Sequence, residues 1–374
     1  MKRIMIIAPD PSGDLYGANL AREIKRISDV EIIGAGGEFM KKEGVDIRLE
    51  VTGLSGIGVF EVFSKVLPVI RIYRGLKRLL EEVKPGCLVL IDSPELNIRI
   101  AKVGKRLGIP VVYWIPPQVF AWRRGRTKKV ARIVDAVIPI IPNDFEIYRE
   151  VSSNCFFFGH PLVDLVSTNL EREEACKRFG VDGNKKVIGL LPGSRVEEIE
   201  SLLPSMLLAA EKIRSSFKDT QFIIPLAKTI SASKVINLIK DRIPVSIISD
   251  NTYDVIKICS ILIVTSGTAT LEAAILGVPM VIVYKLHPLS FLLARLLVKV
   301  QWIGLPNIIL KREVVPELIQ KDANKDNMAE TIIGLLNNQK RLERIKKDLG
   351  IVRNRLGKNG VIKKTAEKIL QMTE

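Results

Sequence analysis

Short apolar segments alternate with helix-like segments along the chain in two separate series, which predicts an α/β fold in two domains. The first series begins at residue 4 and the second at residue 187. Apolar runs of strand length followed by helices predict βαβ units, so each domain is expected to be Rossmann-like with a mostly parallel sheet. The length of 374 residues also fits two domains, each able to bury its own core.

The first series is expected to supply six short strands, at residues 4–8, 31–35, 87–91, 111–113, 136–141 and 155–158. A turn at 9–14 and a helix from about 16 to 27 separate the first two strands. Residues 56–80 have helical spacing, with one apolar face and one basic face. Such a helix either packs on a core as a surface helix or lies in an anionic interface.

The second series is expected to supply five strands, at residues 187–191, 221–226, 245–248, 261–264 and 280–284. The mixed charge and weak helical pattern before it predict a linker over 166–186, so the first domain would span 1–165. The second domain would span 187–345. The last helices, 346–374, are expected to pack back on the first domain.

The strand at 261–264 runs directly into Thr265, Ser266, Gly267 and Thr268, and a short apolar helix follows. Backbone N–H groups at such a helix start suit a phosphate. Glu272, one helical turn further on, can accept hydrogen bonds from a ribose diol. The alternative is a capped helix whose hydroxyl groups satisfy the free N–H donors.

A second glycine turn, with Gly193, Ser194 and Arg195, follows the strand at 187–191 and opens a helix. It predicts a second phosphate-binding turn with an arginine. The turn is not a Walker A sequence, because it lacks the G-K-[ST] ending.

Asp92 directly follows the strongly apolar strand at 87–91. In open α/β sheets the reactive residues lie just beyond the carboxyl ends of strands, so Asp92 is well placed to act as a general base. A carboxylate at a strand end can equally cap the following helix, and the sequence leaves both roles open.

The charge predicts anionic partners. The chain has 57 Lys and Arg against 41 Asp and Glu, a net charge of +16, and residues 71–132 alone hold fifteen basic and four acidic residues. This balance favours nucleic acid, an anionic membrane or a phosphorylated substrate, with a solubilising surface as the alternative. The loop at 114–126 places arginines beside two tryptophans, a combination that can bind phosphate, stack on bases or anchor acyl chains.

Other classes of protein are disfavoured. The four cysteines lie far apart with no C-x-x-C pair, which indicates a reducing, cytoplasmic setting and no zinc site. The first apolar segment is too short for a signal peptide. The most lipid-like segment, 288–309, is interrupted by Arg295, Lys299 and Pro306, so it is not expected to cross a membrane, although it can lie on one. His160 is one of only two histidines, which leaves little room for a histidine-based triad.

Two α/β domains with anion-binding turns mainly in the second are typical of the GT-B architecture of nucleotide-sugar glycosyltransferases. Seven segments, in the same order as in that family, resemble lipid-A-disaccharide synthases. They are residues 8–14 (A-P-D-P-S-G-D), 91–97 (I-D-S-P-E-L-N), 118–123 (Q-V-F-A-W-R), 158–164 (F-G-H-P-L-V-D), 191–195 (L-P-G-S-R), 266–272 (S-G-T-A-T-L-E) and 304–307 (G-L-P-N).

The resemblance implies a hexosyltransferase with its active site in the cleft between the domains, peripheral on the inner face of the inner membrane. Its substrates would be UDP-2,3-diacylglucosamine and 2,3-diacylglucosamine 1-phosphate, joined through a β(1→6) bond with release of UDP. It implies no cofactor, no metal and no nucleic acid. The sequence leaves the oligomeric state open, with a homodimer among the alternatives.

The reaction inverts the anomeric centre, so a single in-line attack with one base is sufficient. Asp92 is the first candidate for that base, and Asp10, which also follows a strand, is the second. Arg195 and the Ser266–Thr268 turn would stabilise the departing UDP without a metal. Other roles follow from the resemblance. Glu272 would bind the ribose, Asn307 would line the donor site, and the acceptor or its phosphate would meet Ser12, Asn97, Trp122, Arg123, Arg124 and Arg126.

One position departs from the family. Its members usually read A-G-E-x-S-G-D at the first turn, and here Pro9 and Asp10 replace the glycine and the glutamate. Asp10 keeps a carboxylate but reaches one methylene less, and proline fixes a backbone angle that glycine leaves free. A direct catalytic role is therefore better supported for Asp92 than for Asp10.

Three other functions compete with this hypothesis. Another GT-B enzyme, either a lipid II-forming N-acetylglucosaminyl transferase or a UDP-GlcNAc 2-epimerase, would share the UDP-binding turn. A basic nucleic-acid-binding module would explain the charge but not two phosphate-type turns at strand ends. A membrane-binding scaffold without activity would not need Asp92, Arg195 and Glu272.

Overall fold

The computed structural model describes residues 2–51, 62–119, 125–227, 230–239, 243–286, 291 and 301–373, with only the backbone described for 62–68. The chain divides into two compact units. Among the described residues, unit 1 contains 2–164 and 356–373, and unit 2 contains 165–286, 291 and 301–355.

Unit 1 is built on a six-stranded parallel sheet in the order β3-β2-β1-β4-β5-β6. Its strands are β1 (Arg3–Ile7), β2 (Glu31–Gly36), β3 (Asp46–Glu50), β4 (Cys87–Ile91), β5 (Val111–Trp114) and β6 (Ala136–Ile138). Every residue of the central β4 is buried, because helices cover both faces of a parallel sheet and leave no polar side.

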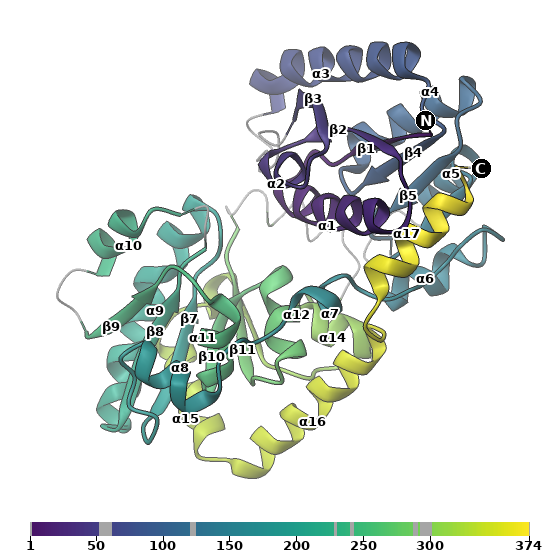
Figure 1. Ribbon diagram of the computed structural model, residues 1–374. Helices are drawn as coiled ribbons and strands as arrows, with labels where there is room; N and C mark the ends of the chain where they lie inside the picture. Colours follow the sequence, from purple (N-terminus) through teal and green to yellow (C-terminus); the bar gives the residue numbers. More distant parts are fainter. Residues whose placement is uncertain are drawn as a thin grey trace. The chain divides into compact units, whose positions relative to one another are not determined.

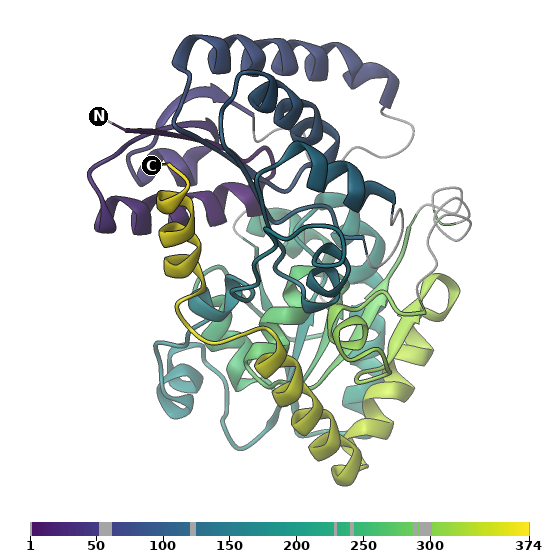
Figure 2. The same cartoon turned by 90° about the vertical axis from the view of Figure 1, so that its right-hand side faces the viewer.

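The helices of unit 1 lie on both faces of this sheet. In Figure 1, α1 (Pro11–Ile27) and the yellow α17 (Val361–Gln371) lie side by side on one face, and α3 (Val62–Val83) lies on the other. Figure 2 shows the same two layers after a quarter turn. The other helices are α2 (Glu38–Lys42), α4 (Pro94–Arg106), α5 (Gly125–Ile133), α6 (Pro142–Tyr148) and α7 (Leu162–Leu165), the last at the boundary of the unit.

Unit 2 repeats the same plan with a sheet in the order β12-β11-β10-β7-β8-β9, again parallel throughout. Its strands are β7 (Lys186–Leu191), β8 (Thr220–Pro225), β9 (Val245–Ile248), β10 (Ile261–Thr265), β11 (Met280–Tyr284) and β12 (Glu317–Ile319). The two central strands, β7 and β10, hold the two glycine turns at their carboxyl ends.

Two helices of unit 2, α9 and α12, each pack against two other helices. The long α9 (Val196–Ser216) packs against α15 (Lys325–Leu336) and α10 (Ala232–Ile239), and α12 (Thr268–Ile275) packs against α14 (Leu305–Leu310) and α16 (Gln339–Arg355). The other elements among the described residues of unit 2 are α8 (Arg172–Arg178), α11 (Thr252–Ile258) and the 3-10 turn η2 (Gln320–Asp322).

The predicted class, two Rossmann-like domains with parallel sheets, is confirmed, and two local predictions are wrong. Residues 155–158 do not form a strand, because only Cys155 forms a bridge, to Val137. The expected turn at 9–14 is mostly helix, since α1 begins at Pro11. Proline suits that first helical position, where its fixed φ fits and its missing N–H costs nothing.

The boundaries of the units differ from those expected. The segment 166–186 belongs to unit 2, where the Asp254 carboxylate accepts hydrogen bonds from the backbone N–H groups of Asn169 and Leu170, at 2.8 and 3.0 Å. At the other end, α16 also belongs to unit 2, and the chain returns to unit 1 at Leu356, ten residues later than residue 346.

The last helix is anchored in unit 1 by polar contacts. The Asp164 carboxylate accepts hydrogen bonds from the N–H groups of Gly360 and Ile362, at 2.7 and 2.8 Å, and so caps α17. Gly159 lies so close to the chain before α17 that a Cβ there would be 2.5 Å from the Leu356 carbonyl oxygen, and its φ is +119°. Glycine is therefore required at this contact.

Within the part of the chain that the structure describes, no helix is both long and apolar enough to cross a membrane. Much of the apolar segment predicted at 288–309 lies outside the described residues, and its last part forms α14.

Replacing Gly159 by alanine should release α17, because the new Cβ meets a carbonyl oxygen and the backbone conformation suits only glycine. We expect a cost of about 2–4 kcal/mol, read as faster hydrogen exchange of the α17 amides. Gly180→Ala is the control, since Gly180 also has a positive φ, of +65°, but lies in unit 2 with nothing within 4 Å of the added Cβ. Equal exchange of α17 in both variants would contradict the proposed contact.

Candidate active site

Asp92 lies at the carboxyl end of β4, near the middle of the unit 1 sheet. Asp92 and Ser93 both have left-handed backbone conformations, with φ of 54° and 43°. Such angles cost about 1–2 kcal/mol for a side chain other than glycine and persist only where the surroundings impose them. Here the Asp92 carbonyl oxygen accepts hydrogen bonds from Asn97 Nδ2 and the Tyr113 hydroxyl, each at 2.8 Å.

Asn97 is therefore a structural residue of this turn. It is fully buried, and its second amide hydrogen is donated to the Ile91 carbonyl oxygen at 3.0 Å. The sequence predicted that Asn97 meets the acceptor. Its two amide hydrogens instead hold the backbone that presents Asp92, and its buried Oδ1 has no hydrogen-bond partner among the described atoms.

Asp10 lies beside Asp92 in unit 1. It occupies the N-cap position of α1, and its Oδ2 accepts a hydrogen bond from the Ser93 hydroxyl at 2.5 Å. Burial, and then the negative charge of Asp10, raise the pKa of Asp92 to about 6 against the opposing effect of a hydrogen bond from the Ser93 backbone N–H. A carboxylate with a pKa near 6 is ionised at neutral pH and still basic enough to accept a proton from a reacting hydroxyl.

Asp14, which follows Asp10 by four residues in the first turn of α1, has a structural role. Its buried carboxylate accepts hydrogen bonds from the N–H groups of Gly37, Phe39 and Met40, at 2.8, 2.9 and 3.3 Å. It thereby caps the start of α2, which stabilises the connection after β2.

The candidates for acceptor binding are only partly described. Ser12 is exposed on the first turn of α1. Arg126, on α5, is paired with Glu95 of α4 at 2.6 Å, and its side chain is only 19% exposed. Trp122, Arg123 and Arg124 lie outside the described residues.

The turn after β10 presents backbone donors. Gly267, at φ 148°, is the N-cap residue of α12, and it is exposed together with Thr268. Among the described atoms no acceptor is found for the N–H groups of Gly267, Thr268 and Ala269, whereas the N–H and hydroxyl of Thr270 both bond the Gly267 carbonyl oxygen. The start of α12 therefore offers three adjacent donors and the positive end of a helix dipole to an anion.

Ser266 fixes this turn and does not point its hydroxyl at a ligand. Its Oγ donates a hydrogen bond to the Ile303 carbonyl oxygen at 3.1 Å. The side chain thus ties the end of β10 to the chain just before α14, and only the backbone of the turn remains available to an anion.

Glu272 lies one turn into α12 and is partly buried. Burial raises its pKa to about 7 against the opposing effect of a long hydrogen bond from the Tyr253 hydroxyl, at 3.4 Å. Burial, and then the nearby Glu272 carboxylate, raise the pKa of Tyr253. A carboxyl group with few partners and a raised pKa is suited to binding a polar ligand.

The turn after β7 is different from the one predicted. The N–H groups of Ser194 and Arg195 both donate to Glu198 Oε2, at 3.1 and 3.3 Å. The Gly193 φ of 122° brings the backbone so close that an added Cβ would overlap the same carboxylate. These donors are satisfied by a side chain of α9, as in a capped helix. The Arg195 guanidinium is exposed and lies 3.9 Å from Glu198 Oε1, so it can still contact an anion from its open side.

Asn307 does not line an open site. It is fully buried, its Nδ2 donates to the Val315 carbonyl oxygen and Glu317 Oε1, and its Oδ1 accepts from the N–H groups of Val314 and Val315, all within 3.0 Å. Because all four hydrogen-bonding positions are used, the amide cannot also bind a sugar.

Glu317, at the start of β12, was missed by sequence reasoning. Its carboxylate accepts hydrogen bonds from the N–H groups of Ile303 and Gly304, each at 2.9 Å, and from Asn307 at 2.7 Å. The carbonyl oxygen of Ile303 accepts the Ser266 hydroxyl, so Glu317 holds the turn at the start of α12 indirectly, through Ile303. No local sequence signal distinguishes such a carboxylate from an exposed one on an edge strand.

His160 is buried in unit 1 and acts as a hydrogen-bond acceptor. Burial lowers the pKa of His160 to about 3, so its ring stays neutral, and its Nδ1 accepts the Leu162 N–H. Within the described part of the chain, no group of three or more His, Cys, Asp and Glu side chains is arranged to hold a metal ion.

Comparison with known proteins identifies the family. The family model described as lipid-A-disaccharide synthetase matches residues 4–372. The chain belongs to the lipid-A-disaccharide synthase family. It is 39% identical to the lipid-A-disaccharide synthase of Geobacter metallireducens, with 99% of this chain and 97% of that protein covered. The enzyme from Nitrosococcus oceani is 38% identical, over 99% and 96% of the two chains.

The sequence-based hypothesis is thereby confirmed at the level of family and activity, a glycosyltransferase of lipid A biosynthesis. Solved structures support the fold alone. UDP-GlcNAc 2-epimerase from Neisseria meningitidis has a TM-score of 0.69 at 13% identity, covering 99% of this chain and 100% of its own. MurG of Acinetobacter baumannii has a TM-score of 0.64 at 13% identity, over 99% and 100%.

Replacing Glu317 by alanine should loosen the support behind the α12 turn, because three donors lose their acceptor. We expect a loss of about 2–5 kcal/mol in local stability, measured as faster hydrogen exchange at Ile303 and Gly304. The control is Glu313→Ala, which removes only an exposed ion pair with Arg341 at 3.8 Å and should change stability by less than about 0.5 kcal/mol. Similar exchange rates in the two variants would show that Glu317 does not hold this segment.

Proposed function

We propose that the protein transfers the sugar of UDP-2,3-diacylglucosamine to 2,3-diacylglucosamine 1-phosphate, forms a β(1→6) bond and releases UDP. The observation that supports this most strongly is Asp92, a carboxylate with a pKa of about 6 held in a strained turn at a strand end, in a chain of this family. Strained backbone and a raised pKa together are typical of a residue selected for reactivity.

In the proposed reaction the 6-hydroxyl of the acceptor attacks C1 of the donor sugar from the side opposite UDP. The new C1–O6 bond forms while the bond from C1 to the β-phosphate oxygen breaks. The hydroxyl proton passes to Asp92, and the electron pair leaves with UDP. Asp10 would raise the basicity of Asp92 through its negative charge, as a positioning residue rather than a second base.

Unit 2 would bind the leaving group. The free N–H groups of Gly267 and Thr268 would bind the diphosphate as its charge grows, and the exposed Arg195 guanidinium would add a positive charge. Glu272 would accept hydrogen bonds from the ribose hydroxyls. Asn307 would act through the backbone near Ser266, since its own side chain is fully engaged.

Unit 1 would bind the acceptor and face the membrane. Ser12 and Arg126 are the described candidates for contact with the acceptor, and Trp122, Arg123 and Arg124 remain candidates from the sequence. A groove of about 580 Å³ between α3, α4 and α5 is lined by four basic residues together with Tyr73 and Ile133, the basic ones being Arg99, Lys102, Lys105 and Arg106. This combination of positive charge and apolar surface supports docking on anionic lipid at the cytoplasmic face of the inner membrane. A homodimer is part of the proposal only as an alternative assembly.

The direct test is to incubate the purified protein with both proposed substrates and to analyse the lipids by mass spectrometry. We expect a tetraacyl disaccharide 1-phosphate and one equivalent of UDP. Substrates that lack either the UDP or the 1-phosphate serve as controls. Folded protein that binds UDP but yields no disaccharide under these conditions would overturn the proposed reaction.

The pH dependence tests Asp92 as the base. Turnover should fall as pH drops through about 6, because protonated Asp92 cannot accept the hydroxyl proton. Asp10→Asn should move this limb to lower pH, since removing the negative charge lowers the pKa of Asp92. Asp92→Asn should cost about 10²–10⁴-fold in turnover with UDP binding retained, and Asp29→Asn, at an exposed position before the start of β2, serves as control. Near-normal turnover of Asp92→Asn would exclude it as the base.

A further inference from the structure

A second cation-rich site lies in unit 2, away from the turn that is proposed to bind UDP. A cavity of about 390 Å³ opens at the amino-terminal edge of the sheet, where Lys186 begins β7, Ser260 precedes β10 and Pro279 precedes β11. The turn at Ser266–Thr268 lies at the opposite, carboxyl-terminal edge of the same sheet. The cavity is therefore separate from the candidate active site.

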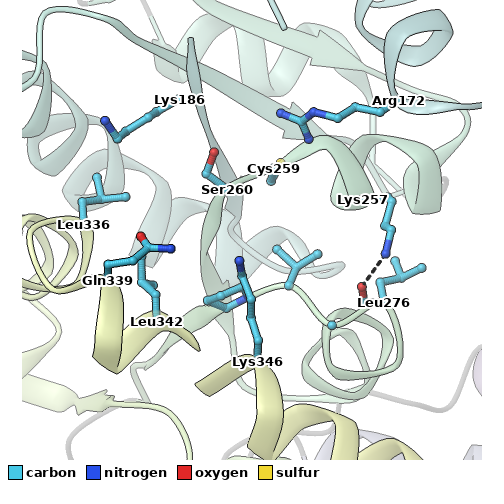
Figure 3. A pocket seen from close by; sticks show the side chains of 13 residues that line it. Arg172, Lys186, Lys257, Cys259, Ser260, Leu276, Leu336, Gln339, Leu342 and Lys346 are labelled. Carbon is cyan, nitrogen blue, oxygen red and sulfur yellow. Dashed lines mark hydrogen bonds between the residues drawn. The ribbon is translucent and has the colours of Figure 1, made fainter. Parts of the chain in front are cut away.

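The charge of this cavity is one-sided. Four cationic side chains line it, and no carboxylate is among the lining residues; the four are Arg172, Lys186, Lys257 and Lys346. Figure 3 shows Lys346 pointing into the cavity from α16, with Ser260 and the Arg172 guanidinium on the far side. The only acidic partner of these cations in the described residues is Glu343, which lies on α16 and contacts Lys346 at 2.9 Å.

The cations have structural contacts that use only part of their hydrogen-bonding capacity. Arg172 donates one hydrogen bond to the Ile258 carbonyl oxygen at 2.8 Å, and Lys257 donates one to the Leu276 carbonyl oxygen at 3.0 Å. Lys186 lies over the Phe217 ring at 5.3 Å. A guanidinium has five N–H donors and an ammonium has three, so most donors remain available to a ligand.

The rest of the lining indicates the kind of anion. Leu276, Val278, Leu336 and Leu342 supply an apolar wall, and Gln339 and Ser260 add neutral polar groups. The volume is within the range of small-molecule sites and well above that of a single phosphate. We propose that this cavity binds a phosphorylated small molecule, with its phosphate among the four cations and its organic part against the apolar wall.

Three probes distinguish the sources of such a ligand: pyrophosphate, ADP and dihexanoyl phosphatidic acid. Binding of each to the full-length protein is measured by calorimetry at fixed ionic strength, without sugar donor or acceptor. The outcome is therefore independent of whether the proposed transfer reaction is correct. Pyrophosphate tests phosphate alone, ADP tests a nucleotide and phosphatidic acid tests a lipid headgroup with short chains.

Two variants address the cavity. Lys186→Gln/Lys346→Gln removes two cations, and Gln339→Glu places a carboxylate at the cavity while all four cations stay. Each variant should lower the affinity for a probe that binds by about tenfold or more, because charge-assisted hydrogen bonds to the phosphate are lost or are opposed by a negative charge. The control Lys185→Gln/Lys347→Gln removes the same number of positive charges as the first variant, at neighbouring positions outside the lining. It should change the affinity by less than about twofold.

At least one probe that binds the unmodified protein, is weakened by both cavity variants and is unaffected in the control would support the site and identify its source. If every probe binds all the variants and the unmodified protein equally, or binds none of them, the proposal is overturned. In that case the four cations serve only their structural contacts. Thermal melts of each variant establish that a loss of binding does not reflect unfolding.

Discussion

Backbone groups at the carboxyl ends of the parallel strands must find partners, and this constraint shapes both units. A parallel sheet uses its own N–H and C=O groups within the ladder, but the loops that leave its edge do not. Carboxylates satisfy such loops here: the buried Asp14 holds the start of α2 after β2, and the partly buried Glu317 holds the chain between β11 and α14. The partly buried Asp164 does the same at the start of α17. Removing any of these acceptors would leave buried donors unpaired, which costs more than a surface contact.

The candidate site consists of polar groups that these structural hydrogen bonds do not use. Asn97 and Tyr113 bond the carbonyl oxygen of Asp92, and its carboxylate accepts a hydrogen bond only from the Ser93 backbone N–H among the described groups. The N–H groups of Gly267 and Thr268 have no acceptor among the described atoms, although Ser266 beside them is fixed through Ile303. Rigid support and unpaired polar groups therefore occur at the same turns. That combination is what a reacting ligand requires, because the donors and acceptors are already oriented when it arrives.

The positions of the strand ends could be predicted from the sequence. Which residues at those ends cap the structure and which can bind a ligand could not. Buried parallel strands read as short apolar runs, which located β4, β7 and β10 and the polar residues after them. The edge strand β3 alternates charged and apolar residues, and it escaped notice. Capping and ligand binding use the same side chains and turns. Gly193–Arg195 therefore looked like a phosphate site, but Glu198 occupies its donors, as Val315 and Glu317 occupy Asn307.

The raised pKa of Glu272 bears on how a ribose would bind. With a pKa of about 7, the carboxyl group is roughly half protonated at neutral pH, and burial is the main cause. A ribose diol donates hydrogen bonds, so it favours the ionised form and would lower that pKa on binding. Donor binding in the proposed role would then release protons at neutral pH and tighten as pH rises through 7. Asp92, with a pKa of about 6, is already ionised at neutral pH, so Glu272 is the group that sets the pH above which both carboxylates carry the charge that their proposed roles need.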